Sequence, residues 1–167
     1  ARLERGRMLE LRRCEVALDS LLETEIEFLL DPLTPEQRSQ ACLQWELSPV
    51  RAWVDPERFR QVVGNLVGNS LKYCPPGTPI HIGLHCSEQS WELQVIDEGP
   101  GIPADQQPRL FEPFERRSSA IQGSGLGLWI CRVTVEAHQG QWGLDSPWNG
   151  RGCRFWCRVP VGAGTPT

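Results

Sequence analysis

The stretch of sequence that decides the fold is Asp55–Tyr73, which reads DPERFRQVVGNLVGNSLKY. An aspartate followed by a proline marks a helix start, because the aspartate side chain caps free backbone N–H groups and proline fits the first helical turn. Apolar side chains then recur at helical spacing, at Phe59, Val62, Val63, Leu66 and Val67. We therefore expect a helix over residues 56–73 that buries one face in the core.

The same helix carries polar side chains on a second stripe. Asn65, Asn69 and Lys72 occupy positions i, i+4 and i+7, which lie on one side of a helix. A carboxamide oxygen is a suitable ligand for a magnesium ion that is also held by phosphates and water. An ammonium group is a compact charge that suits a phosphate. Taken alone, the stripe is also compatible with a polar face in contact with solvent.

A second segment of interest is Asp97-Glu98-Gly99-Pro100-Gly101, which follows a predicted strand. Asp97 can point its carboxylate into a pocket, while the glycines let the backbone approach a ligand closely. A carboxylate only accepts hydrogen bonds, and the amino group of adenine donates them, so the two groups match. The motif is weak by itself, because turns often use aspartate and glycine.

A third segment, residues 123–128, reads GSGLGL and runs into a helix expected over residues 126–138. Glycines before a helix expose backbone N–H groups to an anion, and the helix dipole adds to the attraction. The alternative is a flexible loop. Between the two glycine segments lie aromatic side chains that could dock a mobile lid and arginines that could reach a terminal phosphate. These residues are Phe111, Phe114, Arg116 and Arg117.

The rest of the chain alternates helices with mostly antiparallel strands. Residues 18–30 are expected to form a helix capped by Asp19 or Ser20. Residues 45–54 are expected to form a strand that Pro49 restricts to an edge or a break. Two antiparallel hairpins are expected, from residues 80–86 with 91–96 and from 141–145 with 153–159. These elements indicate an α+β fold, a two-layer α/β sandwich with helices on one face of a mixed, mostly antiparallel sheet.

Composition narrows the function classes. The chain has 167 residues, of which 40% are hydrophobic and 23% charged, so one domain with an ordinary core is expected. A formal net charge of −4 argues against general nucleic-acid binding. No apolar stretch has the roughly 20 residues of a membrane span. The seven cysteines lack any C-x-x-C spacing, which predicts thiols in a reducing, cytoplasmic environment.

In their order along the chain, these segments resemble the catalytic ATP-binding domain of sensor histidine kinases. That family belongs to a superfamily with gyrase, heat-shock chaperone and mismatch-repair ATPases. The resemblance extends over roughly residues 45–160. The matching segments are residues 58–73 for the family's N box, 97–103 for its G1 box, 111–114 for its F box and 123–128 for its G2 box.

The resemblance implies a Bergerat-type fold and a division of the chain. The catalytic domain would occupy residues 14–160, preceded by the remnant of a dimerisation helix or linker at residues 1–13. A loose tail would follow at residues 161–167. ATP and Mg²⁺ would bind beneath a lid that extends over about residues 102–122.

The resemblance also implies roles for individual residues. Asn69 would hold Mg²⁺, and Asn65 and Lys72 would orient and contact the phosphates. Tyr73 would line the nucleotide pocket, and Asp97 would read adenine. Further nucleotide contacts are implied at Gly99, Gly101, Ile102, Phe114, Gly123, Ser124, Gly125, Leu126, Gly127 and Leu128. The implied catalytic set is Asn65, Lys72, Arg116 and Arg117.

The residue at position 65 favours phosphoryl transfer over hydrolysis. The ATPase relatives carry a glutamate there that activates water, whereas the carboxamide of Asn65 cannot take a proton near neutral pH. In the kinase family the phosphoacceptor is a histidine followed by an acidic residue. His81, His85 and His138 all lack that neighbour, so we expect them to be structural.

The expected phosphoacceptor is therefore a histidine on a dimerisation helical hairpin outside this chain. A response-regulator receiver domain is the other expected protein partner, and no nucleic-acid partner is expected. This fragment should be monomeric and the full-length kinase a homodimer, either soluble or membrane-anchored. The alternatives left open are an ATPase or serine kinase of the same superfamily and a non-catalytic nucleotide-sensing module.

Overall fold

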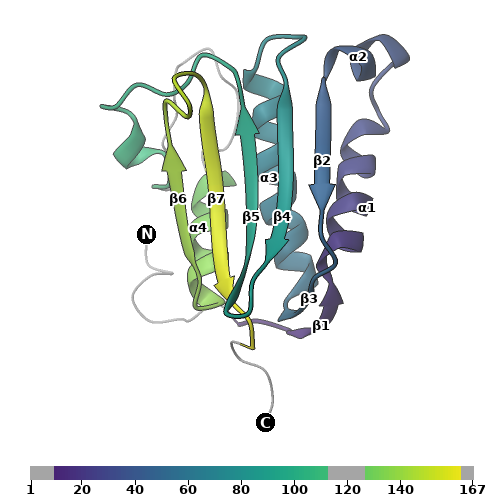
Figure 1. The fold of residues 1–167 in the computed structure, drawn as a ribbon, viewed down its shortest axis with the longest axis vertical. Coiled ribbons are helices and arrows are strands. Elements are labelled where there is room, and N and C mark those ends of the chain that lie inside the picture. The colour runs from purple at the N-terminus through teal and green to yellow at the C-terminus, as the bar shows by residue number, and fades with distance from the viewer. Residues whose placement is uncertain (1–9, 113–126, 163–167) are drawn as a thin grey trace.

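The computed structural model describes residues 10–112 and 127–162 (Figure 1). Its main feature is a five-stranded sheet with the strand order β2-β4-β5-β7-β6. Strand β2 runs parallel to β4, and every other pairing in this sheet is antiparallel. This confirms the mixed, mostly antiparallel sheet. The strands are β2 (Leu43–Leu47), β4 (Ile80–Cys86), β5 (Ser90–Asp97), β6 (Gln141–Asp145) and β7 (Cys153–Pro160).

Three longer helices cover one face of this sheet (Figure 1), namely α1 (Leu18–Leu30), α3 (Pro56–Tyr73) and α4 (Gly127–Ala137). The short helix α2 (Pro35–Gln40) lies between α1 and β2, and a turn of 3₁₀ helix, η1 (Gln107–Arg109), follows β5. The predicted two-layer α+β architecture is thus confirmed. None of the helices in the described part of the chain is long and apolar enough to cross a membrane.

Helix α3 forms as its sequence predicts. The Asp55 carboxylate accepts hydrogen bonds from the backbone N–H groups of Glu57 and Arg58, at 3.1 and 3.3 Å. The apolar stripe is buried, and the Phe59 ring meets the edge of Trp91 with ring centroids 5.3 Å apart. Burying such a stripe removes several large apolar side chains from water, and this orients the helix on the sheet.

Strands β5 and β7 alternate between buried and more exposed side chains, as strands with one covered face do. In β5 the alternation places Asp97 on the side that faces the helices, after Trp91, Leu93 and Val95. Cys153, the first residue of β7, is the cross-strand partner of Asp97. The sheet therefore delivers a carboxylate and a thiol together to the edge of the core.

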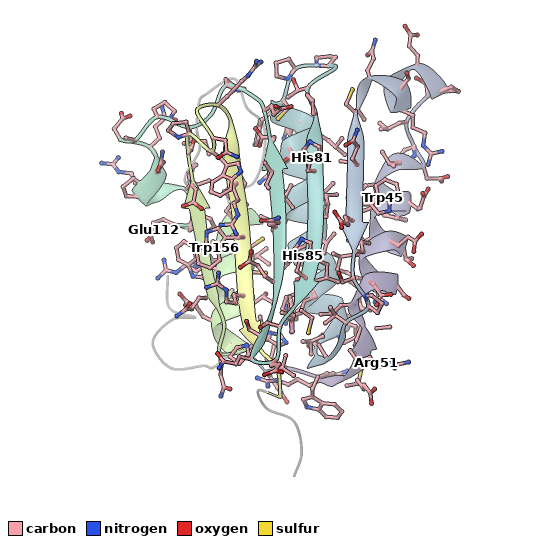
Figure 2. The ribbon with its side chains drawn as sticks, in the orientation of Figure 1. Trp45, Arg51, His81, His85, Glu112 and Trp156 are labelled. Carbon is pink, nitrogen blue, oxygen red and sulfur yellow. The ribbon has the colours of Figure 1, made fainter. Side chains whose placement is uncertain are left out.

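The other face of the sheet is polar and carries no helix. Figure 2 labels three of its side chains, His81 and His85 from β4 and Trp156 from β7. The Arg154 guanidinium donates to the Glu92 carboxylate at 2.7 Å and lies over the Trp156 ring, 5.6 Å from its centroid. Stacked and paired groups of this kind let a sheet face contact water without exposing a large apolar area.

Two expectations for the first third of the chain need correction. The helix over residues 18–30 is present, but Ala17 occupies its N-cap position, and the Asp19 carboxylate instead accepts the backbone N–H of Val50 at 3.3 Å. The strand expected over residues 45–54 is two strands. Its first part belongs to β2, and its second part, β3 (Arg51–Val54), pairs with β1 (Cys14–Ala17) in a separate two-stranded sheet.

The segment before β1 also differs from expectation in its described part. Residues 10–13 are not helical. The backbone N–H of Arg12 donates to the Asp55 carboxylate at 2.9 Å, and the Arg13 guanidinium donates to the carbonyl oxygen of Ala137 at 2.9 Å. Tertiary hydrogen bonds therefore fix Arg12 and Arg13 outside any helix, although their composition favours a helix.

Candidate functional site

A pocket lies between the second half of α3, the loop after β5 and the starts of α4 and β7. Five of its lining residues were proposed as ligand contacts from the sequence: Asn69, Tyr73, Asp97, Gly101 and Leu128. The other lining residues are Ser70, Cys74, Pro100, Cys153 and Phe155. The structure therefore brings together groups that lie up to 86 positions apart in the chain.

The Asp97 carboxylate is held in this pocket by two hydrogen bonds. The side chain is buried, at 5% exposure. Oδ1 accepts the backbone N–H of Gly99 at 3.0 Å, and Oδ2 accepts the thiol of Cys153 at 3.0 Å. Each carboxylate oxygen accepts more than one hydrogen bond. Asp97 is thus oriented by the protein and keeps acceptor capacity for a donor in the pocket.

Two glycines with positive φ hold the loop after β5 against β7. Gly152 has a φ of +72°, and a Cβ there would overlap the backbone oxygen of Asp97. Gly101 has a φ of +77° and lies close to Ser146 and Gly152. The Ser146 hydroxyl donates to the Gly152 carbonyl and accepts the N–H of Ile102, both at 2.9 Å. This close packing is possible only without a side chain at these glycines.

The three polar residues of the α3 stripe do not all face the pocket. Asn69 lines the pocket. Asn65 instead faces α4, because its Oδ1 lies 3.2 Å from the position of a Cβ on Gly127. Lys72 is exposed, with Nζ 5.7 Å from the centroid of the Tyr73 ring. In this structure the pocket therefore gathers Asn69, but neither Asn65 nor Lys72 lines it.

A family model described as histidine kinase-, DNA gyrase B- and HSP90-like ATPase matches residues 54–163. The chain belongs to this ATPase family. The match begins just before α3 and continues past β7, so it contains every residue that lines the pocket.

Curated relatives in this ATPase family are sensory kinases. The adaptive-response sensory kinase SasA of Synechococcus sp. (strain JA-3-3Ab) is 38% identical over 157 residues, which cover 92% of this chain and 41% of that protein. SasA of Nostoc sp. (strain PCC 7120) is 44% identical over 131 residues, which cover 77% of this chain and 32% of that protein. The chain thus spans less than half the length of these relatives.

Solved histidine kinases share the fold. The catalytic domain of histidine kinase ThkA, in a nucleotide-free form, has a TM-score of 0.78 at 25% identity, over 90% of this chain and 97% of that one. Full-length ShkA in complex with AMPPNP has a TM-score of 0.78 at 27% identity, over 93% of this chain and 32% of that one. These matches identify the chain as a histidine kinase catalytic domain of the ATPase family.

Other residues that the sequence singled out lie around the pocket or outside the described part. Gly99 binds Asp97 through its N–H, and Ile102 is buried at 4% exposure. Gly127 opens α4 beside Asn65. The remaining predicted residues lie outside the described residues: Phe114, Arg116, Arg117, Gly123, Ser124, Gly125 and Leu126.

None of the three histidines is among the residues that line the pocket. His81 and His85 are exposed on the open face of β4 (Figure 2). His138 is buried at 1% exposure, where its Nε2 accepts the backbone N–H of Asp55 at 3.1 Å and its Nδ1 lies 2.8 Å from the Thr134 carbonyl oxygen. Burial lowers the pKa of His138, so the imidazole is held neutral.

Several residues of the site escaped sequence reasoning, among them Ser70, Cys74, Cys153 and Ser146. Ser70 is buried together with the apolar stripe of α3, yet its hydroxyl has no hydrogen-bond partner among the described residues. Cys153 reaches Asp97 because of the register between β5 and β7, and Ser146 reaches Ile102 and Gly152 from the turn before β7. Neither contact can be predicted from a local sequence pattern. The signal that could have found Ser70 is its place next to Asn69, on the flank of the apolar stripe.

Proposed function

We propose that this chain binds ATP with Mg²⁺ and transfers the γ-phosphoryl group to a histidine of another segment, as the catalytic domain of a sensor histidine kinase. The observation that carries the proposal is the buried Asp97 carboxylate, held by Gly99 and Cys153 and directed into a pocket that Asn69 also lines. An acceptor-only group in such a place selects a ligand that donates, as the amino group of adenine does.

The residues of the pocket fit magnesium and nucleotide together. The described residues contain no cluster of histidine, cysteine, aspartate or glutamate that could hold a metal by itself. Mg²⁺ takes few protein ligands when phosphates and water complete its octahedron, so the amide oxygen of Asn69 is a sufficient contribution. When bound, Mg²⁺ neutralises charge on the transferring phosphoryl group.

The remaining catalytic assignments concern the chain's own residues. The family resemblance assigns Asn69 and Lys72 to binding and positioning the phosphates, with Asn65 in support. It assigns Arg116 and Arg117, which lie outside the described residues, to the terminal phosphate. The carboxamide of Asn65 cannot act as a general base that activates a water molecule, so hydrolysis is slow and the phosphoryl group remains available for transfer to another acceptor. Positioning and charge neutralisation supply most of the catalysis in such a loose transition state.

The acceptor and the second partner come from outside this chain. None of the three histidines contacts the pocket, which supports an acceptor histidine on a dimerisation hairpin. A response-regulator receiver domain is the proposed recipient of the phosphoryl group. One histidine kinase of the same fold, ThkA, has been solved in complex with the response regulator protein TrrA.

The direct test adds a His-bearing dimerisation hairpin from a SasA relative to this chain, with Mg²⁺ and ATP labelled at the γ-phosphate. We expect acid-labile phosphate on the hairpin histidine and negligible free phosphate from this chain alone. Replacing the hairpin histidine with glutamine should abolish the signal. Steady hydrolysis that an Asn65→Ala substitution removes would point instead to an ATPase, and nucleotide binding without any transfer would point to a sensing module.

A further inference from the structure

Two cysteines border the proposed nucleotide pocket, and no function so far uses their reactivity. Cys74 follows the last residue of α3 and is half-buried, and Cys153 begins β7 and is buried. Both line the same pocket as Asp97. The seven cysteines of the chain form no disulfide with one another.

The Cys74 thiol and the carboxylate of Asp97 both lie against Gly99. A Cβ on Gly99 would lie 3.0 Å from Cys74 Sγ but 3.8 Å from Cys74 Cβ, so the sulfur is the part of the side chain nearer to the loop. The same position is 3.0 Å from Asp97 Oδ1. The sulfur atom and Oδ1 of Asp97 are therefore both close to the loop after β5, and both residues line the pocket.

An independent observation marks this pocket as a ligand site. Ser70 lies one helical turn before Cys74 and lines the same pocket. Its side chain is 3% exposed, and its hydroxyl has no hydrogen-bond partner among the residues that the structure describes. A buried hydroxyl without a partner is costly, and a polar ligand would remove that cost. A group bound covalently to Cys74 would enter the space that such a ligand needs.

The other cysteines differ from Cys74 in access or in environment. Cys14 and Cys86 are exposed and Cys42 is half-buried, and none of the three lines the pocket. Cys131 and Cys157 are buried, and burial raises the pKa of both thiols, that of Cys157 to about 12. The thiolate is the reactive form, so these two thiols should stay unreactive. Among the residues lining the pocket, Cys74 is the more accessible thiol.

We propose that Cys74 is a modification site for low-molecular-weight disulfides, and that its adduct and the nucleotide exclude each other. In the reaction, the Cys74 thiolate attacks one sulfur of the disulfide. A new S–S bond forms to Cys74, the S–S bond of the reagent breaks, and the other half leaves as a thiolate that takes up a proton. The exclusion rests on the proposed function, because it requires the nucleotide to occupy this pocket.

The test treats the chain with glutathione disulfide at pH 8, with and without Mg²⁺ and AMPPNP, and follows each cysteine by mass spectrometry of its peptide. Ligand at about 100 times its dissociation constant leaves about 1% of the pocket empty, so modification of Cys74 should slow about 100-fold. Modification of Cys14 and Cys86 should be unchanged, and both serve as internal controls. Calorimetry on the same sample verifies that nucleotide is bound.

The reverse experiment measures nucleotide binding after modification. The treated chain should lose binding and regain it after reduction with dithiothreitol, whereas a Cys74→Ser variant should bind equally before and after treatment. Modification of Cys74 at the same rate with bound nucleotide, or normal binding by the Cys74 adduct, would overturn the exclusion. An unmodified Cys74 would overturn the site itself. Failure of the untreated chain to bind nucleotide would contradict the proposed function instead, while the mass shift still reports on Cys74.

Discussion

At the scale of single residues, the site depends on how Asp97 is held. The two hydrogen bonds to its carboxylate come from a neighbouring glycine and from the strand beside it. Both contacts fix the orientation of the side chain before any ligand arrives. A group oriented in advance binds more tightly, because less conformational freedom is lost on binding.

Replacing Asp97 with asparagine should weaken ATP binding by about 1–3 kcal/mol, since a donor then faces the donor of adenine. The preference for ATP over GTP should shrink by a similar amount. Titration calorimetry with both nucleotides measures the change. The matched control is Glu98→Gln, which removes an equal charge from the exposed neighbouring position. Equal affinity of the unaltered chain for ATP and GTP would contradict the role of Asp97.

Replacing Gly152 with alanine should destabilise the fold more than the same change at Gly150. Both glycines have positive φ, where an L side chain costs roughly 1–2 kcal/mol. At Gly150 nothing lies within 4 Å of an added Cβ, whereas at Gly152 it would overlap the backbone of Asp97. Overpacking should therefore add about 1–3 kcal/mol to the free-energy loss at Gly152. Urea unfolding of the two variants measures this difference in stability. Similar unfolding midpoints would contradict the close approach of Gly152 to the backbone of Asp97.

At the scale of elements, α3 and α4 are joined by a buried histidine. His138, just after α4, accepts the N–H of Asp55 at the start of α3. Arg13 and Asp55 act on this imidazole as charges, and burial is the largest influence on its pKa. A protonated Nε2 could not accept this hydrogen bond, so the junction requires the neutral ring.

This junction should make stability depend on pH. The pKa of His138 is lowered in the folded chain from its ordinary value of 6.5, so the unfolded chain binds more protons just below that pH. The contribution is complete above about pH 7 and is lost progressively as the pH falls below 6.5, with a slope of at most about 1.4 kcal/mol per pH unit. Urea midpoints between pH 5 and 8 measure it.

A His138→Gln variant should flatten that dependence, since its amide oxygen accepts the Asp55 N–H without titrating. The matched control is His81→Gln on the open face of the sheet, which should leave the slope unchanged. An unchanged slope in the His138 variant would show that other groups cause the acid sensitivity.

At the scale of the whole molecule, ligand binding and folding should be coupled. Mg²⁺ with ATP at about 100 times the dissociation constant should raise the free energy of unfolding by about 2.7 kcal/mol, because only the folded chain has the pocket. Chelation of Mg²⁺ should reduce this stabilisation. Asn69→Ala should remove the difference between samples with and without Mg²⁺. Thermal unfolding with ATP measures both effects, and an unaltered Mg²⁺ response in the variant would contradict the assignment of Asn69.

Local patterns predicted those parts of the fold whose causes are local. Helix α3 was predictable because both its N-cap residue and its apolar stripe can be recognised within one short segment of sequence. The two strands within residues 45–54 were not predictable in this way. Pro49 indicates a break in the strand, but it does not indicate that the two halves pair with different strands. For the same reason the sequence found Asp97 but not Cys153, whose role depends on strand register. Asn65 shows a second limit of local patterns. Its spacing correctly places it on the same stripe of α3 as Asn69, but the packing of α4 against α3 decides that its side chain faces Gly127 and does not line the pocket.

The hydrogen bonds of Arg12 and Arg13 have a mechanical consequence. Arg12 is attached to Asp55 at the start of α3, and Arg13 to Ala137 at the end of α4. The opposite ends of these two helices carry Asn69 and Leu128, on the walls of the pocket. A displacement of the backbone ahead of β1 therefore acts on the far ends of the two helices whose other ends border the pocket.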